Sequence, residues 1–222
     1  MMFCPLVALL GAKRPQNRAW QFIVFSFWVI LALPAAQARL LRPEEPPAVH
    51  PLWSWFLVVL MVVGLTNYVP TRFGLAGLLA ALGQATFHWQ YLPFGSQFAP
   101  QQAPLCGLAL MSASAVAAGV LARIPRRPID PLDRIWLDFR DQFGVVWGLR
   151  VAERINASAH MYGWDARLGW HGFSTSASGP AAQISPGVKT ELAKSLGILL
   201  RRFVSSEWIE RRMAGLSPGH EA

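Results

Sequence analysis

The stretch RIWLDFRDQFGVVWGLRVAERIN, residues 134–156, combines tryptophan, phenylalanine, glycine and charge in the pattern of a helix. It follows Asp130 and Pro131, an N-capping residue and a proline suited to the first helical position, so we expect the helix to begin there. Bulky apolar residues fall on one side and smaller ones on another, and the two stripes are offset along the helix. A helix that is apolar on two sides is usually buried by more than one neighbour.

We predict that this helix is the central element of a small domain and carries its packing or partner-binding face. Gly144 and Gly148 each cost a helix about 1 kcal/mol relative to alanine, so the pair indicates close approach by another backbone. An amphipathic helix lying on the bilayer is an alternative, but Asp138 and Asp141 on its polar side would be repelled by anionic lipid. The predicted face comprises Trp136, Phe139, Phe143, Gly144, Trp147 and Gly148.

The sequence before this stretch has the composition of a membrane region. Residues 52–71 and 73–122 contain no Asp, Glu, Lys or Arg, whereas residues 123–222 contain 14 basic and 10 acidic residues. A membrane span needs about 20 mostly apolar residues and must be helical, because lipid offers no partners for backbone polar groups. Four segments fit this requirement, at residues 19–38, 52–69, 73–92 and 103–122.

The expected fold is therefore all-α: a multi-pass helical membrane protein of about four spans, with a small C-terminal helical domain at residues 123–222. Basic residues in the successive short loops number three, two, one, zero and three. The positive-inside rule then places the N-terminal segment, residues 1–18, and the C-terminal domain in the cytoplasm, with the spans in the plasma (inner) membrane. Residues 174–187 are small, polar and interrupted by two prolines, which predicts a mobile loop within the domain.

The first span has a cleavable signal peptide as its alternative. Its apolar stretch is short, basic residues precede it, and PAAQA at residues 34–38 ends in a small-x-small pattern. An uncleaved anchor is favoured because two tryptophans and a proline break also suit an ordinary span. Neither alternative changes the topology of the later spans.

The third and fourth spans are rich in alanine, glycine and serine at a spacing of four residues. Gly77, Ala81 and Ala85 show this spacing in the third span. Ala109, Ala113 and Ala117, with Ser114 and Ala118, show it in the fourth. Small residues in this pattern let membrane helices approach closely, so we predict tight packing within one bundle. A second copy of the chain is the alternative occupant of this ridge.

Two groups of residues provide alternative cofactor sites. His50 and His88 are expected near the outer ends of two spans, and a pair of imidazoles is suited to ligate a b-type haem. Their position among interfacial aromatic residues is an ordinary one, however. A divalent metal is the second alternative, although the spacing of its ligands matches no known metal-binding signature. Those ligands would be Glu153, His160, Asp165 and His171.

The remaining patterns narrow the class of function. No nucleophile motif, phosphate loop or dinucleotide fingerprint is present. The net charge of +8 does not indicate nucleic acid, because acidic and basic residues are mixed along the C-terminal domain and attraction to anionic lipid accounts for it.

The sequence therefore predicts a membrane accessory, assembly or anchoring protein without a catalytic site or cofactor. Besides the lipid bilayer, its partner is expected to be another protein or a second copy of the chain. The alternative is a membrane redox or metal-dependent enzyme subunit that uses His50 and His88, or Glu153, His160 and His171.

Overall fold

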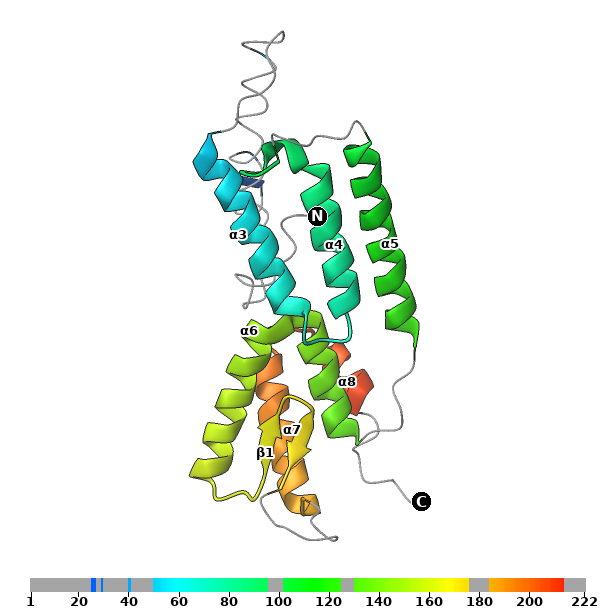
Figure 1. Ribbon diagram of the computed structural model, residues 1–222. Helices are drawn as coiled ribbons and strands as arrows, with labels where there is room; N and C mark the ends of the chain where they lie inside the picture. Colours follow the sequence, from blue (N-terminus) through cyan, green and yellow to red (C-terminus); the bar gives the residue numbers. More distant parts are fainter. Residues whose placement is uncertain are drawn as a thin grey trace. The chain divides into compact units, whose positions relative to one another are not determined.

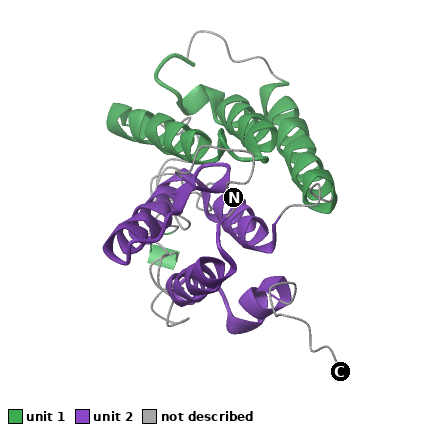
Figure 2. Ribbon diagram, turned by 90° about the horizontal axis from the view of Figure 1, so that it is seen from below, with its two compact units in different colours: residues 1–11, 15–124 green, residues 12–14, 125–222 purple. Residues whose placement is uncertain are grey.

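The computed structural model describes residues 50–95, 102–124, 130–175 and 184–213, together with a few isolated residues before them (Figure 1). These residues are mostly helical and belong to two compact units (Figure 2). Described residues up to Ile124 form unit 1, and those from Asp130 onward form unit 2. The predicted first span, residues 19–38, lies outside the described residues except at isolated positions.

Residues 50–95 and 102–124 of unit 1 form three apolar helices and one short 3-10 helix. Two of them, α3 (Pro51–Tyr68) and α5 (Ala103–Arg123), are the helices among the described residues that are long and apolar enough to cross a membrane. The third predicted span, residues 73–92, is not one continuous helix. Its α-helix has only 14 residues, and the chain then turns into the 3-10 helix. The elements are α3 (Pro51–Tyr68), α4 (Gly74–Phe87), η1 (Trp89–Tyr91) and α5 (Ala103–Arg123).

Glycines set the distance between α4 and α5. A Cβ atom added to Gly83 would lie 2.7 Å from Met111 Cγ and 3.0 Å from the carbonyl oxygen of Gly107. A Cβ atom added to Gly107 would lie 2.6 Å from the backbone nitrogen of Phe87. These distances are shorter than any normal contact, so the two backbones pack closely because neither glycine has a side chain.

A hydrogen bond between the same helices reinforces this packing. Ser114 Oγ of α5 donates to the carbonyl oxygen of Ala76 in α4 over 2.7 Å, and such bonds stabilise helix pairs in lipid. Close packing of small residues is therefore confirmed for this pair. Part of the predicted ridge does not take part, since Ala109 and Ala113 are exposed on α5.

Unit 2 begins as its sequence predicts. The backbone N–H of Leu132 donates to Asp130 Oδ1 over 3.0 Å, with Pro131 at the first helical position. The unit contains α6 (Pro131–Met161), β1 (Arg167–Gly169), β2 (Gly172–Ser174), α7 (Pro186–Leu200) and α8 (Ser206–Met213).

The predicted loop at residues 174–187 is shorter than expected at its C-terminal end. Ser185 caps α7, so Pro186 and Gly187 already belong to the helix. Residues 176–183 of this loop lie outside the described residues.

The expected single helix across residues 134–156 is wrong in one respect. Gly144 has φ 79° and ψ −167°, which are not helical values, and they break α6 into two arms, residues 131–143 and 145–161. The arms form a V in Figure 1, and we call their junction the elbow. The apolar residues of the predicted helix therefore belong to two shorter helices that fold back on each other, rather than to one helix with two neighbours.

A second difference is the short antiparallel hairpin of β1 and β2, which the all-α expectation did not include. Leu168 pairs with Phe173, and Gly169 with Gly172. Gly172 has φ +136°, and a Cβ atom there would lie 2.6 Å from Asp133 Oδ1, so any other residue would be strained at this position.

The core of unit 2 forms between both arms of α6 and the apolar side of α7. Ile209 adds α8 to this core, and a 2.8 Å salt bridge between Arg212 Nε and Asp138 Oδ2 joins α8 to α6. The most deeply buried members are Leu132, Ile135, Trp136, Phe139, Ile155, Leu192, Leu196 and Leu200.

Candidate functional site

The aromatic residues of the predicted packing face lie in the interior of unit 2. Trp136 and Phe139 are completely buried, and Phe143 and Trp147 pack against the core. Phe203, which follows α7, completes the cluster: its ring centroid lies 5.2 Å from that of Phe139, 5.6 Å from Phe143 and 5.3 Å from Trp147. Because Phe143 and Trp147 stand on different arms, Phe203 holds both sides of the elbow.

The two glycines of this face have different roles. Gly144 provides the break in the backbone, whereas Gly148 makes room for side chains. A Cβ atom at Gly148 would lie 3.4 Å from Trp170 Cζ3 and 3.5 Å from Arg140 Cγ. The close neighbours of Gly148 are therefore side chains of the same unit rather than the backbone of another helix.

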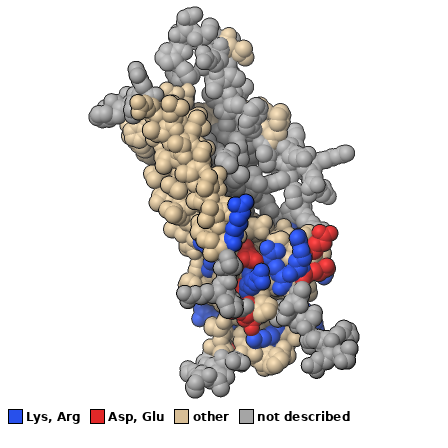
Figure 3. All heavy atoms as spheres, turned by 90° about the vertical axis from the view of Figure 1, so that its right-hand side faces the viewer, with Lys and Arg blue, Asp and Glu red and all other residues tan. Residues whose placement is uncertain are grey.

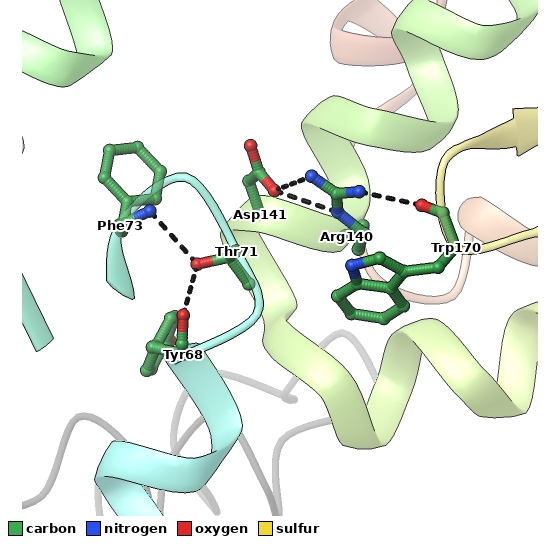
Figure 4. Close-up of polar contacts among 6 residues, drawn as sticks. All are labelled: Tyr68, Thr71, Phe73, Arg140, Asp141 and Trp170. Atoms are coloured by element: carbon green, nitrogen blue, oxygen red, sulfur yellow. Dashed lines mark hydrogen bonds and ion pairs between the residues drawn. The ribbon is translucent and has the colours of Figure 1, made fainter. Parts of the chain in front are cut away.

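A buried ion pair lies beside the elbow (Figure 4). Arg140 donates to Asp141 Oδ1 from Nε (3.0 Å) and Nη2 (2.7 Å), and from Nη1 to the carbonyl oxygen of Trp170 (2.7 Å). The guanidinium also lies 4.8 Å from the centroid of the Trp170 ring. Asp141 was expected on a polar face but is only 2% exposed, and the pairing explains how its charge is accommodated in the interior.

The two histidines of the haem alternative both lie at helix ends. His50 Nδ1 accepts a hydrogen bond from the backbone N–H of Leu52 over 3.3 Å, which caps α3. His88 follows the last residue of α4, and its ring packs against Phe87 at 5.0 Å and Tyr91 at 6.5 Å between centroids. The cap gives His50 a structural role, whereas the Nδ1 atom of His88 is buried without a hydrogen-bond partner among the described residues.

The four residues of the metal alternative, Glu153, His160, Asp165 and His171, are all exposed. Among the described parts of the chain, no three His, Cys, Asp or Glu side chains gather closely enough to hold a metal ion. Asp165 instead accepts a hydrogen bond from Thr175 Oγ1 over 2.7 Å. The structure does not assemble the predicted ligand set.

A polar pocket of about 140 Å³ lies where the first arm of α6 meets β2 and α7. Lys189 Nζ forms a 2.6 Å ion pair with Asp130 Oδ2, and Asp133 Oδ1 accepts a 2.7 Å hydrogen bond from the backbone N–H of Phe173. Burial raises the pKa of Asp133, as does the nearby Asp130, while the Phe173 N–H and Lys189 oppose this shift. No sequence pattern indicated this pocket, because its residues come from three separate segments.

The surface of unit 1 is apolar over long stretches. Its exposed residues include Trp55 and Val59 of α3, Leu78 of α4, and Leu105 and Val116 of α5. On the face shown in Figure 3, the charged side chains gather in one part of the surface and leave a large uncharged part. Comparison of the chain with protein-family models, curated proteins and solved structures gave no match.

Proposed function

We propose that the chain is a multi-pass membrane protein of the accessory or anchoring type, with unit 1 in the bilayer and unit 2 as a cytoplasmic domain that binds a protein partner. The observation that carries this proposal is the exposure of the apolar helices. Only 17% of the most apolar window of α3 and 11% of that of α5 are buried in the protein. The core helix of a water-soluble domain would be mostly buried, so lipid is the environment that suits these surfaces.

The orientation rests on the basic residues of the short connections. Arg123, Arg126 and Arg127 follow α5, while the connection of residues 93–102 carries no charge. By the positive-inside rule, the end of α5 and unit 2 belong in the cytoplasm. The same rule places the predicted first span, residues 19–38, with its N-terminal end in the cytoplasm.

The exposed residues of unit 2 indicate where a partner would bind. The aromatic cluster at the elbow is internal, whereas Met161 and Tyr162 at the end of α6 are 67% and 62% exposed. The ring of Tyr162 stacks on that of Trp164 at 5.1 Å between centroids. Methionine and aromatic residues are enriched in protein interfaces, so we assign partner binding to this exposed group rather than to the predicted stripe.

A topology experiment tests the membrane part of the proposal. A reporter that is active only outside the cytoplasm is fused after Gln97, Arg127 or Ala222 of the full chain. We expect activity at Gln97 alone. Activity at Ala222 would overturn the cytoplasmic placement of unit 2, and activity at none of the three sites would contradict an outer loop after α4.

Site-specific photo-crosslinking tests the partner-binding part. A photoreactive residue replaces Tyr162 in cells, and the control replaces Thr190, an exposed polar residue of α7. We expect a discrete cross-linked product from position 162 and none from position 190, with twice the chain mass identifying a second copy. Equal labelling from both positions would contradict a defined binding surface at the end of α6.

A further inference from the structure

The hairpin of β1 and β2 connects the two arms of α6. On the second arm, Asn156 Oδ1 accepts a hydrogen bond from the backbone N–H of Leu168 (2.7 Å), and Asn156 Nδ2 donates to the carbonyl oxygen of the same residue (3.0 Å). On the first arm, Asp133 Oδ1 accepts from the backbone N–H of Phe173 (2.7 Å). One side chain from each arm therefore holds one strand.

The two contacts meet at the same point of the sheet. Leu168 and Phe173 are direct partners in the antiparallel register. A continuous connection thus runs from Asn156 through Leu168 and Phe173 to Asp133, across both strands. Each outer edge of this two-stranded sheet has backbone groups without a strand neighbour, and the α6 side chains satisfy part of them.

The connection lies away from the elbow. Near the elbow, the arms are held by the ring cluster around Phe203, which contacts Phe143 on the first arm and Trp147 on the second. Asp133 and Asn156 each stand eleven or twelve positions from Gly144, about 17 Å along a helix. At that distance a small change of the elbow angle moves the arms far apart, so a contact there restricts the angle strongly.

The two strands alone are too short to keep the hairpin folded. Each has three residues, and an isolated two-stranded hairpin is marginal in water even when longer. Its position is therefore coupled to α6: the arms order the hairpin, and the hairpin joins the arms.

We propose that the β1–β2 hairpin, held by Asn156 and Asp133, is a conformational bridge that fixes the angle of the α6 elbow, and that the arms separate when the bridge is released. The bridge makes the geometry of unit 2 sensitive to any contact made on the hairpin. This inference does not depend on the membrane topology or on the partner of the proposed function.

The test measures the distance between the arms in the full-length protein in detergent. Spin labels are attached to cysteines at Arg134 and Ala157, exposed positions on different arms, after Cys4 and Cys106 are replaced by serine. Asn156→Ala and Asp133→Ala each release one strand. Asp133→Asn keeps the acceptor for the Phe173 N–H, and Ser158→Ala removes only a hydrogen bond to Arg154 within the helix.

We expect a narrow distance distribution in the parent protein, Asp133→Asn and Ser158→Ala, and a broader, longer one in Asn156→Ala and Asp133→Ala. Tryptophan fluorescence checks that each variant is folded. If Asn156→Ala does not fold, the comparison of Asp133→Ala with Asp133→Asn tests the proposal by itself. Unchanged distributions in the alanine variants would overturn the proposal, because the core alone would then fix the elbow. Equal broadening in Asp133→Asn and Asp133→Ala would also overturn it.

Discussion

Gly144 has a backbone conformation that only glycine adopts without strain. Its φ of 79° and ψ of −167° lie in a region that is closed to residues with a Cβ atom. Gly187 in α7 has open space around it and no positive φ. The two glycines therefore form a matched pair within one unit.

We predict that Gly144→Ala destabilises unit 2 by about 1–3 kcal/mol, whereas Gly187→Ala leaves stability unchanged or raises it by up to about 1 kcal/mol. Denaturant unfolding followed by tryptophan fluorescence measures both. Equal effects of the two substitutions would show that α6 can pass through residue 144 without a break.

Asp133 makes the stability of unit 2 depend on pH. Because burial raises its pKa above the ordinary 3.8, the folded state binds the proton more tightly than the unfolded state. The contribution of Asp133 to stability is therefore largest when its carboxyl group is protonated, and it declines as the pH rises from the ordinary pKa through the raised one. Asp130, the N-cap of α6, adds to this effect, while Lys189 on α7 and the Phe173 N–H of β2 oppose it.

Asp133→Asn removes the buried charge and keeps the hydrogen-bond acceptor. We predict that this variant is more stable than the parent protein at pH 7, and that the difference disappears below pH 3.8. Unfolding curves at several pH values check this. Lower stability of the variant at pH 7 would mean that the attraction to Lys189 outweighs burial.

At the scale of single elements, the packing of α4 on α5 depends on Gly107. We predict that Gly107→Ala lowers the melting temperature of the protein in detergent, because the added methyl group would meet the backbone of Phe87, and overpacking costs about 1–3 kcal/mol. Gly119→Ala in the same helix is the control, since nothing lies within 4 Å of its Cβ position. An equal melting temperature for both variants would contradict the close packing.

Sequence patterns predicted those elements that depend on local chemistry. The cap at Asp130 was expected because it follows from a few neighbouring residues. The break at Gly144 was not, because the apolar pattern continues through it: both arms bury their apolar sides in the same core. The offset between the two apolar stripes was the one feature of the sequence that pointed to this break.

The hairpin and the pocket were missed for a different reason. Three-residue strands are too short to show an alternating pattern. Their contacts also join distant positions, Leu168 with Asn156 and Phe173 with Asp133, which are 12 and 40 residues apart. Periodicity within a segment carries no information about such pairs, nor about the Arg140–Asp141 pair, whose burial depends on Trp170.

At the scale of the whole molecule, the division into two units has a consequence for folding. Unit 2 has its own core and a charged surface, so we predict that the fragment Pro125–Ala222 is soluble, helical and unfolds cooperatively without a membrane. Circular dichroism and tryptophan fluorescence measure this. Trp136→Ala in the fragment should cost about 3–5 kcal/mol, and an aggregated parent fragment would contradict the independence of unit 2.

The elbow also determines the length of unit 2 along α6. Thirty-one residues in one straight helix would measure about 46 Å, longer than the hydrocarbon thickness of a bilayer. Folded at Gly144, the same residues measure about 25 Å along the longer arm and bring Met161 back toward the level of Pro131. The break at Gly144 therefore gives α6 about half the reach that the same residues would have as one rod-like helix.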